Sequence, residues 1–109
     1  MTVKECARAL GLTPYHLGDP DREVSGGYAG DLLSWVMSRA EEGGVWLTIM
    51  SSRNVAAVAE LAGVSCVVLT EGVAPSDTLL AAAKDRGLNL LGSGLSTFAL
   101  SAALADLLE

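Results

Sequence analysis

The sequence predicts an α/β domain: a small, mostly parallel open sheet with helices on both faces. Short, nearly all-apolar runs recur at 45–49, 66–70 and 88–92, and such runs suit strands that are buried on both faces of a parallel sheet. Segments with apolar residues at helical spacing separate these runs. Parallel neighbours need such crossovers. No linker or internal repeat divides the 109 residues, so we expect a single domain over 1–109.

The first elements are predicted from caps and turn residues. Thr2 can cap a helix that ends near Gly11. PYHL (14–17) has the pattern of a short strand, and GDPD (18–21) has that of a turn. REVSG (22–26) is interpreted as a strand that leads into a glycine-rich loop.

VSGGYAGDLLSWVM (24–37) has the order of strand, glycines and helix that phosphate-binding loops use. The segment lacks the lysine and hydroxyl of a P-loop. It also places Asp31 at the helix start, where a carboxylate takes the capping hydrogen bonds and the dipole that a phosphate would need. We therefore favour a structural role, in which Gly26 and Gly27 permit a turn and Asp31 caps a helix that the glycines at 43–44 end. Phosphate binding by the glycines is the alternative.

Three more helices follow the later strands. NVAAVAELA (54–62) has one apolar face, and a second helix has a cap at Ser76 or Asp77 and a glycine stop at Gly87. A closing helix runs from about Ser96 to the end of the chain. The segment before it begins like a dinucleotide-binding fingerprint but lacks the last glycine, so tight turns and a cap explain it better.

The carboxyl ends of the strands are the expected ligand edge, because open α/β sheets bind ligands there, near a switch in strand order. At this edge Ser51, Ser52 and Arg53 bring two hydroxyls and a guanidinium to a helix start, which suits an anion. The alternative is that Ser51, Ser52 or Asn54 caps the helix while Arg53 points into solvent, and the two interpretations have equal weight. The candidate ligand-binding residues near this edge are Gly26, Gly27, Thr48, Ser51, Ser52, Arg53, Asn54 and Ser93.

No catalytic or metal-binding constellation is visible. His16 is the single histidine, and nothing places it beside a nucleophile, so we expect it to be exposed or partly packed. Cys6 and Cys66 lie far apart, with no short spacing to each other or to the histidine, whereas a zinc site needs about four ligands. We expect two buried free thiols, and we predict no catalytic residue, metal or cofactor.

The composition argues against several partners. The formal net charge is −6, and the seven Lys and Arg residues are scattered, so we expect no binding to nucleic acid. No apolar run approaches the roughly 20 residues of a membrane span, and the N-terminal segment does not have the pattern of a signal peptide. The expected location is cytoplasmic, with no membrane partner.

The closing helix is apolar on two sides, which is typical of an interface in a small domain. Trp35 falls outside the apolar stripe of its own helix. These features predict a homodimer with Trp35 and Leu104 at the interface, and they leave room for a protein partner in a signalling or redox complex. The two faces of the closing helix consist of Leu100, Leu104, Leu107 and Leu108, and of Phe98, Ala102 and Ala105.

Taken together, four segments resemble the DRTGG domain family. They are DREVSGGYAGDLLS (21–34), VWLTI (45–49), RNVAAVAELAGVSCVVLTEG (53–72) and GLNLLGSGLSTFAL (87–100), and the match covers nearly the whole chain. The family resembles the N-terminal domain of HPr kinase/phosphorylase and also occurs in phosphotransacetylases and beside nucleotide-sensing CBS domains. The resemblance implies a non-catalytic, dimeric α/β regulatory module.

The chain departs from the family in two ways. Many members carry a histidine at the position of Ser52, so the resemblance does not carry over a ligand or metal role for that loop. The kinase domain of the HPr enzymes, with its P-loop, is absent from these 109 residues.

Two functional hypotheses follow. The first is a regulatory or dimerising module that senses a nucleotide or a phosphorylated metabolite. The second is a stand-alone enzyme that acts on an anionic substrate at the same edge of the sheet. The absence of an evident base, a P-loop lysine and metal ligands from the sequence weighs against the enzyme.

Overall fold

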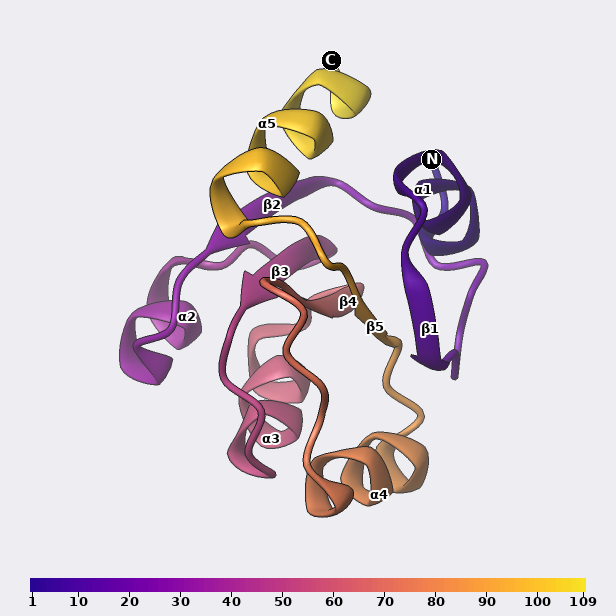
Figure 1. Ribbon diagram of the computed structural model, residues 1–109. Helices are drawn as coiled ribbons and strands as arrows, with labels where there is room; N and C mark the ends of the chain where they lie inside the picture. Colours follow the sequence, from indigo (N-terminus) through magenta and orange to yellow (C-terminus); the bar gives the residue numbers. More distant parts are fainter.

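One five-stranded sheet organises the chain in the computed structural model, which describes all 109 residues (Figure 1). The strand order is β1-β5-β4-β3-β2. Strands β2 to β5 are parallel, and β1 pairs antiparallel with β5. The predicted α/β class with a mostly parallel open sheet is confirmed. The strands are β1 (Thr13–His16), β2 (Gly26–Ala29), β3 (Gly44–Thr48), β4 (Cys66–Leu69) and β5 (Leu90–Gly92).

Five helices cover both faces of this sheet, as expected. In Figure 1, α2, α3 and α4 lie below the sheet, and α1 and α5 lie above it. Two separate apolar clusters correspond to these two faces. None of the helices is long and apolar enough to cross a bilayer. Their bounds are α1 (Val3–Leu10), α2 (Leu33–Arg39), α3 (Asn54–Ala62), α4 (Asp77–Arg86) and α5 (Thr97–Leu108).

The four parallel strands follow one another across the sheet in chain order. Helices α2, α3 and α4 each return the chain over the same face to the neighbouring strand. The expected switch in strand order is therefore absent from the parallel part of the sheet, and no crevice of that origin forms. Grooves between neighbouring helices on one face are what this topology offers instead.

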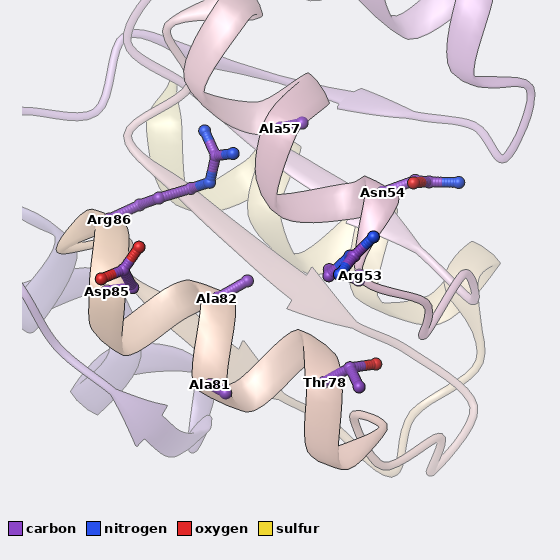
Figure 2. Close-up of a pocket in the computed structure, with 8 residues that line it drawn as sticks. All are labelled: Arg53, Asn54, Ala57, Thr78, Ala81, Ala82, Asp85 and Arg86. Atoms are coloured by element: carbon purple, nitrogen blue, oxygen red, sulfur yellow. The ribbon is translucent and has the colours of Figure 1, made fainter.

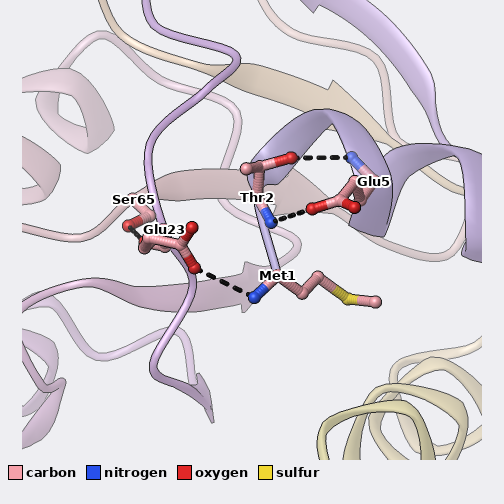
Figure 3. A network of polar contacts seen from close by, with 5 residues as sticks. All are labelled: Met1, Thr2, Glu5, Glu23 and Ser65. Atoms are coloured by element: carbon pink, nitrogen blue, oxygen red, sulfur yellow. Dashed lines mark hydrogen bonds and ion pairs between the residues drawn. The ribbon is translucent and has the colours of Figure 1, made fainter.

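A polar network links the N-terminal segment to neighbouring segments of the fold (Figure 3). The Thr2 hydroxyl accepts a hydrogen bond from the Glu5 amide (3.2 Å), and the Glu5 carboxylate accepts one from the Thr2 amide (2.9 Å), which completes a capping box. The hydrogen bond that the Thr2 amide donates to this carboxylate is the main cause that lowers the pKa of Glu5. The Met1 ammonium donates to Glu23 (2.9 Å), which raises the pKa of the N-terminus. The Ser65 hydroxyl in turn donates to the Glu23 carbonyl, so the network joins α1 to the segment before β2 and to the segment before β4.

The glycine-rich segment is a strand, so its interpretation as a turn was wrong. The predicted strand over 22–26 forms a single bridge, between Glu23 and Thr2, and regular pairing with β3 begins at Gly26. A Cβ at Gly27 would lie 2.9 Å from a terminal methyl of Leu104. Glycine at this position therefore lets α5 pack closely on β2.

The two cysteines are free and buried, as predicted. Both belong to the apolar cluster under α1 and α5. Burial raises the pKa of the Cys66 thiol to about 12. This thiol therefore stays protonated and unreactive at neutral pH.

Candidate functional site

A groove of about 560 Å³ runs between α3 and α4 (Figure 2). Arg53 and Asn54 lie toward one end of it, and Asp85 and Arg86 lie toward the other. The groove is lined by Arg53, Asn54 and Ala57 of the α3 segment and by Thr78, Ala81, Ala82, Asp85 and Arg86 of α4.

The start of α3 has no side-chain cap. Arg53 holds the N-cap position in helical conformation, and its side chain makes no capping hydrogen bond. The side chains of Ser51, Ser52 and Asn54 form no hydrogen bond within the chain, and the amides of Ser52, Arg53 and Asn54 have no acceptor in it. The alternative that one of these polar side chains caps α3 is therefore wrong. The free amides and the guanidinium remain available to an anion.

The start of α4 lies next to the start of α3. The Ser76 amide donates to the Ser51 carbonyl (3.1 Å), which joins the two segments. The Ser76 hydroxyl caps α4 by accepting from the Leu79 amide (3.1 Å), while the amides of Asp77 and Thr78 have no acceptor in the chain. Two helix N-termini, each equivalent to about half a positive charge, thus lie at the same end of the groove, and the exposed Asp77 carboxylate in the first turn of α4 offsets part of that charge.

The far end of the groove carries the second guanidinium. Arg86 Nη1 lies 3.3 Å from Glu60 Oε1, an exposed ion pair across α3 and α4. Asp85 is the one carboxylate among the lining residues, against two guanidiniums. The alanines between the two ends keep the floor open. Because Glu60 pairs with Arg86, the guanidinium left without an ion pair is that of Arg53, at the end of the groove where the two helices start.

The other candidate ligand residues lie outside this groove. Thr48 is buried and donates to Asp31 (2.8 Å). Gly26 and Gly27 are part of β2, at the edge of the sheet. The Ser93 hydroxyl accepts a hydrogen bond from the Leu95 amide (3.1 Å) in the turn before α5. Of the predicted ligand residues, Arg53 and Asn54 line the groove, Ser51 and Ser52 precede it in the chain, and the other four lie elsewhere.

Asp31 does not cap α2. The N-cap position is held by Leu32, which makes no side-chain capping bond. The Asp31 carboxylate instead accepts from the Thr48 hydroxyl (2.8 Å) and from the Ile49 amide (3.0 Å). The pairing of the strands explains this difference. Because β2 and β3 are parallel and end side by side, the carboxylate that follows β2 lies next to the end of β3 and binds there instead of to the helix amides.

The two predicted interface residues have different environments. Leu104 is 3% exposed and packs inside the domain, so its assignment to a dimer interface was wrong. Trp35 is 50% exposed, and the Arg39 guanidinium lies 3.9 Å from the centroid of its ring. His16 is partly buried with Nδ1 2.9 Å from the Leu88 carbonyl, which confirms the expectation of a partly packed histidine.

Sequence reasoning missed the α4 half of the groove, namely Thr78 and Arg86. Each residue has an ordinary helical role, Thr78 in the first turn of α4 and Arg86 in its last turn. The available signal was topological: consecutive crossovers on one face would place the starts of α3 and α4 next to each other. That arrangement could not be inferred while a switch in strand order was expected.

Comparison with known proteins gives a structural match but no sequence match. No family model matches the sequence, and no curated protein matches it. Among solved structures, the chain is similar to the CBS and DRTGG domains of the regulatory region of Clostridium perfringens pyrophosphatase, complexed with its activator, diadenosine tetraphosphate. The TM-score is 0.73 at 14% sequence identity, over 94% of this chain and 45% of that chain. The match confirms the DRTGG-like resemblance at the level of the fold, and this chain spans about half the length of the chain it matches.

Proposed function

We propose that this chain is a non-catalytic regulatory domain that binds a nucleotide or a phosphorylated metabolite in the groove between α3 and α4. The observation that carries the proposal is the juxtaposition at one groove end of the Arg53 guanidinium with the unpaired amides of two helix starts. Guanidinium groups and helix N-termini are the groups that proteins use for phosphate.

The residues of the groove favour recognition over catalysis. Thr78 supplies the one hydroxyl of the lining, and Asp85 the one carboxylate. They are seven residues apart on α4, about 10 Å along the helix axis at ~1.5 Å per residue. A general base must lie within hydrogen-bond reach of the proton it removes. Asp85 therefore has no access to the Thr78 hydroxyl, and the pair does not form an activated nucleophile.

The structural match supports the ligand class. The matched region is regulatory, and its activator is a nucleotide with four phosphates. A fold of the same kind thus occurs in a protein region whose ligand is rich in phosphate. The inference for this chain rests on the groove itself, and the match adds a regulatory context.

Replacement of Arg53 with Ala is expected to weaken phosphate-ligand binding by about tenfold to a hundredfold, because a hydrogen bond to a charged group contributes roughly 1.5–3 kcal/mol. A thermal-shift panel of nucleotides and phosphorylated metabolites identifies a ligand, whose affinity is then measured by titration calorimetry. A ligand at about 100 times its dissociation constant stabilises the domain by roughly 2.7 kcal/mol.

Arg8→Ala is the matched control. Arg8 is an exposed arginine of α1 that forms no ion pair, and its substitution removes the same charge. Its affinity is expected to equal that of the unmodified chain. Equal weakening by the two substitutions would show a general charge effect and would contradict a site at Arg53.

We also propose a homodimer that buries the half-exposed Trp35 face of α2. Burial of apolar surface contributes about 25 cal/mol per Å², and a two-fold axis lets one patch serve both subunits. Light scattering coupled to size exclusion should give twice the 11.2 kDa chain mass, and Trp35→Asp should return it to one chain. A monomer mass at micromolar concentration would refute the dimer, and a dimer that survives Trp35→Asp would refute this face.

A further inference from the structure

Strand β2 is an open edge of the sheet. It pairs with β3 on one side, and no strand lies on the other. The Gly30 amide donates to the Leu47 carbonyl (3.1 Å). Because successive residues of a strand alternate in direction, the amides of Gly27 and Ala29 face away from β3.

The two edges of the sheet are protected to different degrees. Natural edges are blunted by proline, bulges or charged side chains, which discourage pairing with another strand. The opposite edge, β1, has two of these devices, Pro14 and a register shift between Pro14 and His16. Strand β2, with the sequence GGYA, has none of them.

An apolar groove of about 210 Å³ adjoins this edge, between β2 and α5. Leu47, Leu104 and Leu108 contribute apolar side chains to it, and Ala105 borders it from the exposed side of α5. Gly27 also lines the groove and contributes no side chain. The groove has room for an apolar side chain delivered by a strand that pairs with β2.

The surroundings of this edge are acidic. Glu41 lies near the start of β2, with a carboxylate oxygen 3.8 Å from the position that a Cβ of Gly26 would take. Asp31 follows the end of the strand, where its carboxylate also accepts hydrogen bonds from the Thr48 hydroxyl and the Ile49 amide. Neither carboxylate belongs to an ion pair. A segment with basic residues complements this charge.

We propose that the β2 edge binds an extended, basic peptide segment of a partner protein. The segment adds a sixth strand, places one apolar side chain in the groove beside Gly27, and sets its basic residues against Asp31 and Glu41. Strand addition of this kind takes affinity from main-chain hydrogen bonds and specificity from side-chain pockets. The proposal does not depend on the anion site between α3 and α4.

A second copy of the chain does not suit this edge. Antiparallel pairing of two β2 strands would bring Asp31 of one copy toward Glu41 of the other. Two carboxylates would then lie close together at each end of the paired strands, and this juxtaposition of like charges is unfavourable. The charge pattern therefore selects a basic partner and leaves the proposed dimer to the Trp35 face.

The test is a nuclear magnetic resonance titration of the full chain with a synthetic peptide of alternating lysine and leucine. The amide signals of Gly27 and Ala29 are expected to shift, and their hydrogen exchange is expected to slow. A peptide of alternating glutamate and leucine should cause neither change. Shifts centred elsewhere, or spread evenly over the acidic surface, would overturn the proposal.

Two substitutions separate this edge from general charge attraction. Ala105→Lys should weaken peptide binding by at least about tenfold, because a cation would then meet the basic segment. Ala9→Lys adds the same charge at an exposed position of α1 and should leave the affinity unchanged. Equal effects of the two would overturn the proposal. So would slow exchange of Gly27 and Ala29 in the peptide-free chain together with a dimer mass, since a second copy would then occupy the edge.

A backbone substitution tests the strand pairing itself. Ala29→Pro removes an outward-facing donor while leaving the bonds to β3 in place, and prolines are accepted at such edge positions. Circular dichroism confirms that the variant folds. Undiminished peptide affinity in a folded Ala29→Pro variant would contradict pairing along β2.

Discussion

Replacing Trp46 with Ala is expected to lower the free energy of unfolding by about 3–5 kcal/mol, the range for a large buried aromatic side chain. Trp46 is completely buried in β3, within the apolar cluster under α2, α3 and α4. Its indole Nε1 donates to the Gly30 carbonyl (2.8 Å), just after β2. The substitution therefore opens a cavity and also removes a hydrogen bond that fixes the end of the edge strand. Urea unfolding followed by circular dichroism measures the loss.

Trp46→Phe separates the two contributions. It keeps most of the apolar volume and removes the indole donor, so we expect it to cost less than Trp46→Ala. A loss below about 1 kcal/mol for Trp46→Ala would be typical of a surface site. That result would contradict the placement of this side chain at the centre of the core.

Replacing Gly18 with Ala is expected to destabilise the domain by about 1–3 kcal/mol or more, as overpacking does. A Cβ at Gly18 would lie 2.0 Å from the Gly87 carbonyl oxygen, a backbone atom that cannot rotate away. The chain must shift between the turn at 18–21 and the end of α4. That shift also strains Asn89, whose amide group donates to the Asp19 carbonyl (2.7 Å) and accepts from the Asp19 amide (2.9 Å).

Gly94→Ala is the matched control for this prediction. A Cβ there meets nothing within 4 Å, and its backbone does not lie in the left-handed region. The free energy of unfolding should change by less than about 0.5 kcal/mol, as at most surface sites. If the two alanine variants unfolded at the same urea concentration, the close approach of Gly18 to Gly87 would be disproved.

The helices and the central strands could be predicted because their signals are local. Asn54–Ala62 has the bounds that its apolar face indicated. Of the two predicted caps of α4, Ser76 is the one that forms, and Gly87 ends this helix as predicted, in left-handed conformation. The all-apolar runs mark β3, β4 and β5, since each is buried on both faces.

The edge strand could not be predicted, because contacts with other segments determine the conformation of its residues. Gly27 has low strand propensity, yet it pairs with Val45 of β3, and a side chain of α5, Leu104, packs where its Cβ would lie. Asp31 had the sequence context of a helix cap, and its partners at the end of β3 exist only after the strands pair. These contacts join segments that are far apart in the sequence, and no local pattern encodes them.

The candidate site was half predicted for the same reason. The Arg53 guanidinium and the amides at 52–54 are contiguous in the chain, so their chemistry could be recognised from the sequence, whereas the Ser51 and Ser52 hydroxyls do not line the groove. Thr78 and Arg86 enter the site through the packing of α4 beside α3, which depends on the order of the strands. The sequence was also consistent with a capped α3, and the uncapped start of this helix is a feature of the structure.

The most direct test of the account is a titration of the isotope-labelled chain with inorganic diphosphate, followed through its backbone amide signals. We predict saturable shifts centred on the unpaired amides of Arg53, Asn54 and Thr78, and their loss in the Arg53→Ala variant. The absence of saturable shifts at millimolar diphosphate, or shifts centred on residues outside the groove between α3 and α4, would contradict the proposed anion site.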